Sequence, residues 1–337
     1  MTNAADAMEP TNSVPTLAEL RESEVLARIF PRLPAASAQQ LGPGDDAAVV
    51  TAADGRFVVT TDMMIHGPDF RLAWSTPLDL GWKAAATNLS DVAAMGARPT
   101  ALVVAIAAPP STPVSVIEGI ADGLRQCCEA LAPGCGVVGG DLSASDTLTI
   151  AVTAFGDLEG RAPVLRSGAR VGDIVAIAGS LGAAGRGLAL LFEGGVDDNG
   201  EPDAARAEAL RRTHPELLAA QLRPDSPVAL GAAAAVAGAS AMLDVSDGLA
   251  IDAGRIARAS NVGIDFESAA LGDFPDAALH GGEDHGLLAT FPVGTQIPAG
   301  FRKLGVVTDA AGIVLVDGSP HDQDGWDPYR GWDGAAG

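Results

Sequence analysis

Short apolar runs that end in glycine or aspartate recur along the chain, separated by longer helical stretches. The runs at 100–109, 173–179 and 241–246 have the length and composition of buried strands. Two longer stretches, 76–95 and 113–131, begin at Thr76-Pro77 and at Pro113 and carry the apolar residues of helices. Because the first half combines hairpin signals with this alternation, the pattern predicts an α+β (mixed α/β) fold and not a repeated βαβ series.

A turn-rich stretch divides the 337-residue chain into two predicted domains. Residues 157–173, DLEGRAPVLRSGARVGD, show no periodic apolar pattern. A chain of this length suits two domains better than one. We therefore expect a disordered tail over 1–15, an N-terminal domain over 16–156 and a C-terminal domain over 157–337.

Local signals predict three further features. A capping box that begins at Thr16 predicts a helix running to about Phe30. An Asp-Gly dipeptide predicts a hairpin between strands expected at 46–52 and 56–61. The glycine-rich stretch 179–187 leads into a helix, and it suits either helix packing or an anion site at the helix start.

The charge balance limits the partners of this chain. It carries 43 acidic and 21 basic residues, for a net charge of −22. Such a surface repels nucleic acid and anionic lipid, so we expect neither a nucleic-acid nor a membrane partner. A phosphorylated ligand stays compatible, because divalent cations bridge carboxylates to phosphates. The three cysteines lack zinc-type spacing and the N-terminus lacks a secretory signal, which predicts reduced thiols in a cytoplasmic protein.

Several acids lie at predicted strand ends or, for Asp91, on an otherwise apolar helix. They are Asp46, Asp62, Asp91, Asp141, Asp244 and Asp247. Strand ends are where α/β proteins place ligands, and carboxylates gathered there repel one another unless cations lie between them. Mg²⁺ prefers such oxygen ligands. A cap or a turn explains most of these acids singly, and only the set favours metal binding.

Other recognised catalytic patterns are missing from the sequence. The histidines form no zinc-hydrolase frame, and they are His66, His214, His280, His285 and His321. No G-x-S-x-G motif of an α/β-hydrolase occurs. Zinc-hydrolase and serine-hydrolase chemistry therefore have no support.

Six stretches, in this order, resemble the thiamine-monophosphate kinase family: GPGDDAAVV, TTDMMIHGPDF, KAAATNLSDVAAMGARP, VVGGDLS, LDVSDGLAID and GGEDHGLL. The resemblance covers roughly residues 20–330. It implies the two-domain fold of the aminoimidazole ribonucleotide synthetase superfamily and a homodimer joined through the N-terminal sheets. It also implies transfer of the ATP γ-phosphoryl group to thiamine monophosphate, assisted by several Mg²⁺ ions.

The resemblance further implies roles for individual residues. The implied metal ligands are Asp46, Thr60, Thr61, Asp62, Asp91, Asp141, Asp244 and Asp247. The implied ATP contacts are Gly140, Asp141, Arg166 and Ser246. The implied substrate contacts are Asp69, Glu283 and Tyr329. No catalytic base is implied, because positioning and charge neutralisation carry phosphoryl transfer and the acceptor phosphate is already ionised.

One position departs from the family pattern. The family usually has a histidine just before the residue equivalent to Phe70, and this chain has Asp69, with His66 as the nearest histidine. Either His66 takes that role, or thiamine recognition differs, or the activity is lost. Two other readings stay open, namely another ATP-using enzyme of the same superfamily and a non-catalytic Mg-nucleotide-binding module.

Overall fold

Two main β-sheets organise the computed structural model, which describes residues 14–41 and 48–325. The smaller sheet has four strands in the order β3-β6-β4-β5. Its strands are β3 (Val58–Ile65), β4 (Arg98–Ala108), β5 (Gly136–Ala144) and β6 (Thr149–Asp157). β4 and β5 run parallel and the other pairs run antiparallel, so the described part is a mixed α/β fold.

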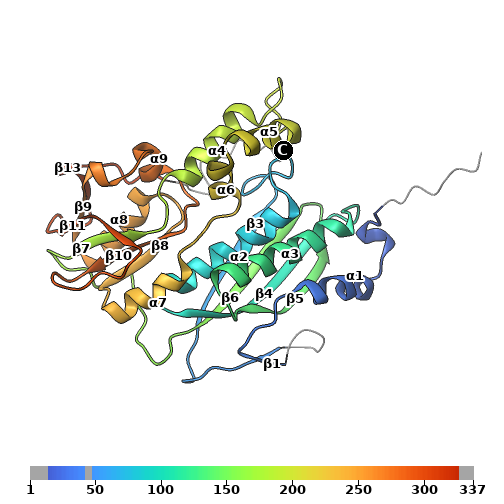
Figure 1. Ribbon diagram of the computed structural model, residues 1–337, viewed down its shortest axis with the longest axis horizontal. Coiled ribbons are helices and arrows are strands. Elements are labelled where there is room, and N and C mark those ends of the chain that lie inside the picture. Colours follow the sequence, from blue (N-terminus) through green and yellow to red (C-terminus); the bar gives the residue numbers. More distant parts are fainter. Residues whose placement is uncertain (1–13, 42–47, 326–337) are drawn as a thin grey trace, which may run out of the picture.

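Two long helices, α2 (Pro77–Ala94) and α3 (Val114–Leu131), cover one face of this sheet (Figure 1). The expected start of α2 is confirmed, because Thr76 and Asp79 form a capping box. The two helices approach closely through glycine. A Cβ on Gly81 would lie 2.0 Å from a backbone oxygen of α3, so no larger residue fits there without displacing a helix.

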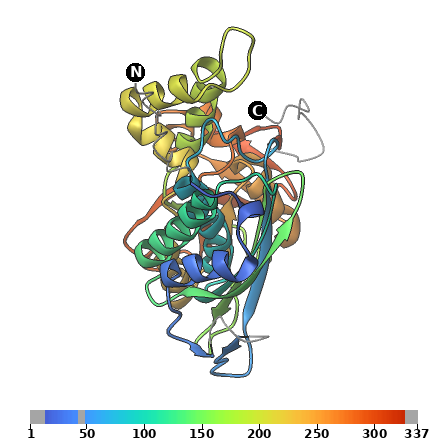
Figure 2. The same ribbon diagram turned by 90° about the vertical axis from the view of Figure 1, so that its right-hand side faces the viewer.

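The opposite face of the four-stranded sheet carries no helix within the described residues, and Figure 2 shows α2 and α3 on one side only. Ala36 and Val50 cover part of this face, where they pack with Ala101, and the face is uncovered at β3. Alternate residues of β3 point to each face. Val59 and Met63 are 54% and 57% exposed on the uncovered face. This surface, with Ile65 beside it, is called the open face below.

The larger sheet has seven strands in the order β13-β12-β9-β11-β7-β10-β8. They are β7 (Ile174–Ala178), β8 (Ala241–Val245), β9 (Gly263–Phe266), β10 (Gly286–Phe291), β11 (Phe301–Thr308), β12 (Val314–Val316) and β13 (Ser319–Pro320). Helix α8 (Leu249–Ser260) follows β8 directly and packs on this sheet, and α9 (Pro275–His280) packs beside α8. The strands expected at 173–179 and 241–246 are therefore confirmed.

A helical segment stands above both sheets (Figure 1). It comprises α4 (Ala183–Gly194), α5 (Ala204–Thr213) and α6 (Pro215–Leu222), and α6 was not predicted from the sequence. The buried carboxylate of Asp79, near the start of α2, ties this segment down. It forms ion pairs with Arg211 at 2.5 Å and Arg223 at 3.1 Å.

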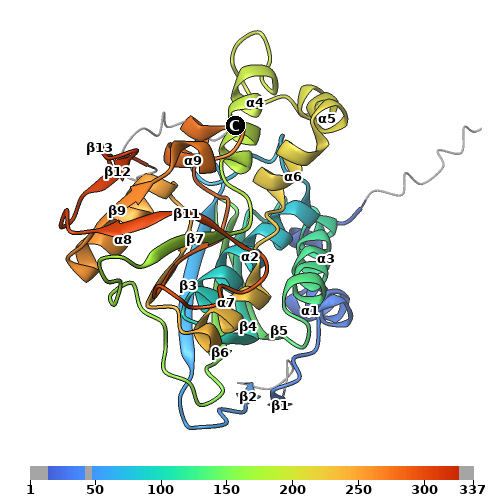
Figure 3. The same ribbon diagram turned by 60° about the vertical axis from the view of Figure 1, so that its left-hand side comes forward.

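Helix α7 (Val228–Ala237) joins the two halves, because it lies beside α2 between the sheets (Figure 3). A Cβ on Gly231 would lie 2.1 Å from the carbonyl oxygen of Ala93 in α2. One hydrophobic cluster accordingly contains residues from both sheets, such as Val152 and Phe291. The division of the chain at 156 and 157 stays a prediction.

Two local predictions are wrong. The helix expected from Thr16 to Phe30 is interrupted, since a short 3₁₀ turn (Leu17–Glu19) precedes α1 (Glu22–Ile29) and a second 3₁₀ turn (Phe30–Arg32) follows it. The capping box at Thr16 is present, but it caps only the first turn.

The expected Asp-Gly hairpin does not form, although Gly55 has the φ of +76° that such a turn requires. β2 (Val49–Val50) pairs with β1 (Gln39–Leu41), while β3 pairs with β6. Long-range pairing of β3 with β6 in the four-stranded sheet therefore overrides the local turn signal.

Two further features are the hydrophobicity of the helices and the state of the cysteines. Within the described residues, no helix combines the length and apolarity needed to cross a membrane. The three cysteines, Cys127, Cys128 and Cys135, are buried and form no disulfide.

Gly231→Ala is expected to destabilise the protein by about 1–3 kcal/mol, because its methyl group would enter the backbone of α2. At a helix position without such contact, the same change stabilises by roughly 1 kcal/mol. The free energy of unfolding, measured in urea, should therefore decrease if Gly231 packs against the α2 backbone, and an increase would contradict this contact. Val236→Ala, at a 73% exposed position of the same helix, serves as control and should change stability by less than about 0.5 kcal/mol.

Candidate functional site

Two cavities open along the boundary between the two sheets, where α2 lies, and this boundary is called the seam. The first, of about 520 Å³, lies against α4 and is called the α4 cavity. Its lining includes Asp69, Trp74, Lys83, Phe192, Ser246 and Glu283. The second, of about 720 Å³, lies against β3 and is called the β3 cavity. Its lining includes Phe57, Thr60, Asp91, Arg166 and Asp244.

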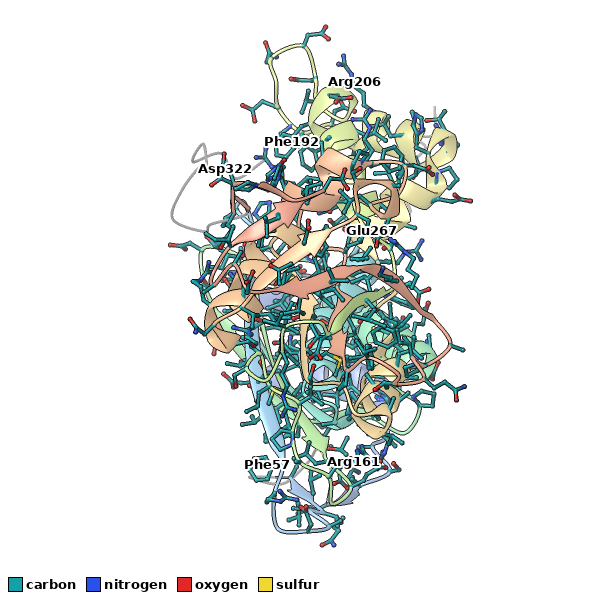
Figure 4. The ribbon with its side chains drawn as sticks, turned by 90° about the vertical axis from the view of Figure 1, so that its left-hand side faces the viewer. Phe57, Arg161, Phe192, Arg206, Glu267 and Asp322 are labelled. Atoms are coloured by element: carbon teal, nitrogen blue, oxygen red, sulfur yellow. The ribbon has the colours of Figure 1, made fainter. Side chains whose placement is uncertain are left out.

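The two cavities lie toward different ends of the molecule. Figure 4 shows Phe192, which lines the α4 cavity, near one end, and Phe57, which lines the β3 cavity, near the other. The walls differ in chemistry. Trp74 and Phe192 meet edge to face in the α4 cavity, and the guanidinium of Arg71 lies about 5 Å from both rings.

Three carboxylates from three elements approach one another on the helix-covered side of β3. Asp62 lies on β3, Asp91 on α2 and Asp244 on β8. The hydroxyl of Thr60 donates to Asp91 at 2.8 Å, and the backbone N–H of Asp62 donates to Asn88 at 3.2 Å. The seam therefore gathers oxygen groups where α2 passes between the two sheets.

Burial and mutual repulsion perturb these carboxylates. Burial, with the negative charges of Asp244 and Asp62, raises the pKa of Asp91 to about 7. Burial and the charge of Asp244 likewise raise the pKa of Asp62. Asp244 differs, because hydrogen bonds from His285 and Ser90 outweigh its burial and lower its pKa. Asp62 and Asp91 thus lie in a region of negative potential that the surrounding protein does not neutralise.

The loop that precedes β10 supplies two further charged side chains. Glu283 and His285 have φ angles of +72° and +49°, values that are rare for residues other than glycine. Their backbone N–H groups donate to the carbonyls of Ser246 and Val245, each at 2.8 Å. This conformation directs Glu283 and His285 toward α2, and such strained positions cluster at functional sites.

Glu283 and His285 form a buried chain of charges with Lys83. The ammonium of Lys83 lies 2.9 Å from the Glu283 carboxylate. Burial acts to raise the pKa of Glu283, but Lys83 and His285 outweigh it and lower the pKa to about 2. Burial acts to lower the pKa of His285, but Asp244 and Glu283 outweigh it and raise the pKa to about 10.

The residue between them, Asp284, points the other way and binds the start of α4. Its carboxylate accepts hydrogen bonds from the backbone N–H groups of Gly182 at 2.5 Å and Ala184 at 3.1 Å. The anion at this helix start is therefore a side chain of the protein itself. The helix-packing reading of the glycine-rich stretch holds, and α4 begins inside it.

Comparisons with known proteins place this geometry in a family. Residues 44–158 match the family model of the AIR synthase related protein, N-terminal domain. The thiamine-monophosphate kinase of Mycobacterium tuberculosis is 46% identical over 333 residues, which cover 94% of this chain and 92% of that protein. This chain belongs to the thiamine-monophosphate kinase family.

Solved structures agree with this assignment. The structure described as AaThiL complexed with AMPPCP and TMP has a TM-score of 0.69 and 33% identity, covering 84% of this chain and 90% of that chain. A thiamine-monophosphate kinase from Stenotrophomonas maltophilia has a TM-score of 0.71 and 31% identity, covering 89% and 96%. The two-sheet architecture is thus that of the thiamine-monophosphate kinase family.

The metal ligands implied by the family resemblance fall into groups. Thr60, Asp62, Asp91 and Asp244 lie together at the seam. Thr61 points to the open face, where it accepts a hydrogen bond from Thr153 at 3.1 Å. Asp141 pairs with Ala105 in the sheet register, and both side chains are exposed on that same face. Within one chain, Thr61 and Asp141 therefore do not converge with the other four.

Asp247 lies near the seam group, where its charge contributes to the raised pKa of Asp62. It forms an ion pair with Arg255 at 2.6 Å. It does not cap α8, since Gly248 occupies the cap position. Asp46 and Tyr329 lie outside the described residues.

The implied ligand contacts also separate by cavity. Arg166 lines the β3 cavity, whereas Ser246, Asp69 and Glu283 line the α4 cavity. Asp69, which replaces the usual histidine of the thiamine-monophosphate kinase family, accepts a hydrogen bond from the backbone N–H of Ile65 at 2.7 Å, and burial raises its pKa. Its carboxylate is therefore anchored by the chain end of β3.

His66 does not line the α4 cavity, and its ring packs against Phe70 with centroids 5.6 Å apart. Gly140 lies on β5, where it pairs with Val104. A Cβ there would lie 2.0 Å from the carbonyl oxygen of Val104, so glycine is required by packing.

The residues at the seam fit Mg²⁺ by their chemistry. Among the described residues, no three His, Cys, Asp or Glu side chains stand in an arrangement that would hold a metal ion unaided. The repulsion among Asp62, Asp91 and Asp244 nevertheless marks a place where a cation would be stabilised. Thr60 adds a hydroxyl oxygen of the same hard character.

Lys83 and His285 are the site residues that the sequence reasoning missed. Lys83 is only 5% exposed and His285 only 2%. A lysine within an apolar helical stretch was the available signal, because a buried lysine needs a charged partner. No comparable signal marked His285, whose partners Asp244 and Glu283 are brought to it by the fold.

Asp91→Asn is expected to raise the free energy of unfolding by about 2 kcal/mol at pH 8 without divalent cations. A carboxyl group whose pKa rises on folding from 3.8 to about 7 loses stability as the pH increases through that interval. The gain should therefore vanish near pH 4. Urea unfolding at both pH values measures it, with the exposed Asp146→Asn as control. A variant no more stable than the wild type at pH 8 would contradict the repulsion.

Proposed function

We propose that this protein transfers the γ-phosphoryl group of ATP to the phosphate of thiamine monophosphate, giving thiamine diphosphate. The observation that carries the proposal is the carboxylate group of Asp62, Asp91 and Asp244. Asp91 and Asp244 line the β3 cavity, and His285 links Asp244 to Glu283 of the α4 cavity. Relatives of this chain bear the name thiamine-monophosphate kinase, and a solved relative is described with AMPPCP and TMP. Two cavities with a metal-compatible seam suit a reaction between two phosphorylated ligands.

The proposed placement follows the chemistry of the cavities. We assign ATP to the β3 cavity, where Arg166 offers a guanidinium to phosphate oxygens. We assign thiamine monophosphate to the α4 cavity, where the aromatic wall suits the heterocycles and Glu283 and Asp69 suit their positive charge. Asp69 then contributes a carboxylate in place of the imidazole usual in the family.

In this proposal the protein contributes position and charge. The acceptor phosphate oxygen is ionised at neutral pH, so the transfer requires no strong base. Mg²⁺ would be held by Asp62, Asp91 and Asp244, with Thr60, and would neutralise the phosphate charge when bound. Lys83 and Glu283 would orient the acceptor within the α4 cavity. In-line alignment of the two ligands would then supply most of the rate acceleration.

The direct test incubates the purified protein with Mg-ATP and thiamine monophosphate and measures thiamine diphosphate and ADP. Equal amounts of the two products are expected. Asp91→Asn should lower the rate by at least about a hundredfold while the protein stays folded, since it removes one of the oxygens that would hold the metal ion. Asp146→Asn should leave the rate unchanged. Tight nucleotide binding without any transfer by the wild type would favour the non-catalytic reading instead.

We also propose that two copies pack through their open faces. Met63 and Val59 leave an apolar surface on β3 that a second copy would bury. Val59 also lines the β3 cavity, so the open face reaches the assigned nucleotide site around the edge of the sheet. Gly140 and Asp141 of a second copy would then approach the nucleotide from this face. The buried, unpaired cysteines support a reducing, cytoplasmic location.

Met63→Asp is expected to convert the protein to a monomer, because it places a charge within the proposed interface. Light scattering coupled to size-exclusion chromatography measures the mass. Val293→Asp, at a 77% exposed position away from β3, is the control and should leave the mass unchanged. A wild-type protein that elutes as a monomer would exclude the proposed interface.

A further inference from the structure

His285 is buried between two acids that belong to different cavities. Its Nδ1 lies 3.2 Å from a carboxylate oxygen of Asp244, which lines the β3 cavity. Its Nε2 lies 3.5 Å from a carboxylate oxygen of Glu283, which lines the α4 cavity. A single rigid ring therefore contacts one carboxylate from the lining of each assigned ligand site.

The surrounding hydroxyl groups hold the ring at both nitrogens. The hydroxyl of Ser90 lies 3.3 Å from Nδ1 and also donates to Asp244 at 3.0 Å. The hydroxyl of Thr87 lies 3.4 Å from Nε2 and donates to the carbonyl of Lys83 at 2.9 Å. Because both hydroxyls belong to α2, the ring is fixed to the helix that lies between the two sheets.

The backbone of this loop is strained at the same two positions. Glu283 and His285 both have positive φ, a conformation that is costly for residues other than glycine and persists only where the surroundings impose it. The strain brings both a carboxylate and an imidazole to α2 from one short loop.

We propose that His285 is a positioning residue whose two ring nitrogens set the placement of Asp244 and Glu283 relative to each other, and thereby align the nucleotide and the acceptor. The inference rests on the proposed function, which assigns the two ligands to the two cavities. Through Nδ1 the ring orients the carboxylate on the nucleotide side. Through Nε2 it orients the carboxylate on the acceptor side.

Two substitutions separate the two contacts. The side-chain N–H₂ of Asn occupies the place of Nδ1, so His285→Asn retains a donor to Asp244 and loses the contact to Glu283. The N–H₂ of Gln occupies the place of Nε2, so His285→Gln retains a donor to Glu283 and loses the contact to Asp244. Both variants lose the same positive charge, so a difference between them reports geometry alone.

The test measures binding of Mg-AMPPCP and of thiamine monophosphate separately by calorimetry, together with KM for ATP and for thiamine monophosphate. His285→Asn is expected to weaken thiamine monophosphate about tenfold more than it weakens Mg-AMPPCP. His285→Gln is expected to show the reverse preference. Equal weakening of both ligands by both variants, or no weakening by either, would overturn the proposal.

Controls keep the outcomes distinct. His214→Gln, at an exposed histidine, should change neither ligand. Ser90→Ala removes a donor to Asp244, so it is expected to weaken Mg-AMPPCP more than thiamine monophosphate, as His285→Gln does. This variant keeps the proposal testable if neither His285 variant folds. Unchanged affinity for both ligands in Ser90→Ala would then overturn the proposal. If the wild-type protein binds thiamine monophosphate but transfers no phosphoryl group, the proposed function fails while the binding comparison still decides the role of His285.

Discussion

Negative charge concentrated at a buried seam is the constraint on which the rest of this structure depends. Asp62 and Asp91, which are partly buried, approach the buried Asp244, and Glu283 adds a fourth carboxylate. Buried charges of one sign require compensation. Lys83 and His285 compensate part of that charge, and the remainder falls on Asp62 and Asp91. A cation that binds there, together with the phosphates it coordinates, can balance the remaining negative charge.

The fold delivers these groups through α2, which lies between the two sheets. Its close contact with α3 and α7 depends on glycines such as Gly81 and Gly231. Its polar residues meet the strand β3 on one side and the strand β8 on the other, through Asp91 and Ser90. The loop before β10 then closes the arrangement, since Asp284 anchors α4 while its neighbours face α2. Helix α2 thereby contributes to the walls of both cavities, and the strained loop contributes to the wall of the α4 cavity.

Much of this architecture was predictable, and the exceptions have physical causes. The long helices were predicted because capping residues and apolar spacing are local properties, as at Thr76 and Asp79. The hairpin prediction failed because β3 takes its partner from β6, about ninety residues away, which no turn signal reports. The acids at strand ends were recognised by type, but their division between the seam and the open face depends on sheet register. His285 was missed since its role arises only when β8, α2 and its own loop meet.

The most direct test of this account is a crystal structure of the protein with Mg²⁺, AMPPCP and thiamine monophosphate. The account predicts the nucleotide in the β3 cavity beside Arg166 and the thiamine rings in the α4 cavity beside Trp74. The phosphates of both ligands should meet next to Asp91 and Asp244. Phosphates that lie away from these carboxylates, or thiamine rings bound in the β3 cavity, would contradict it.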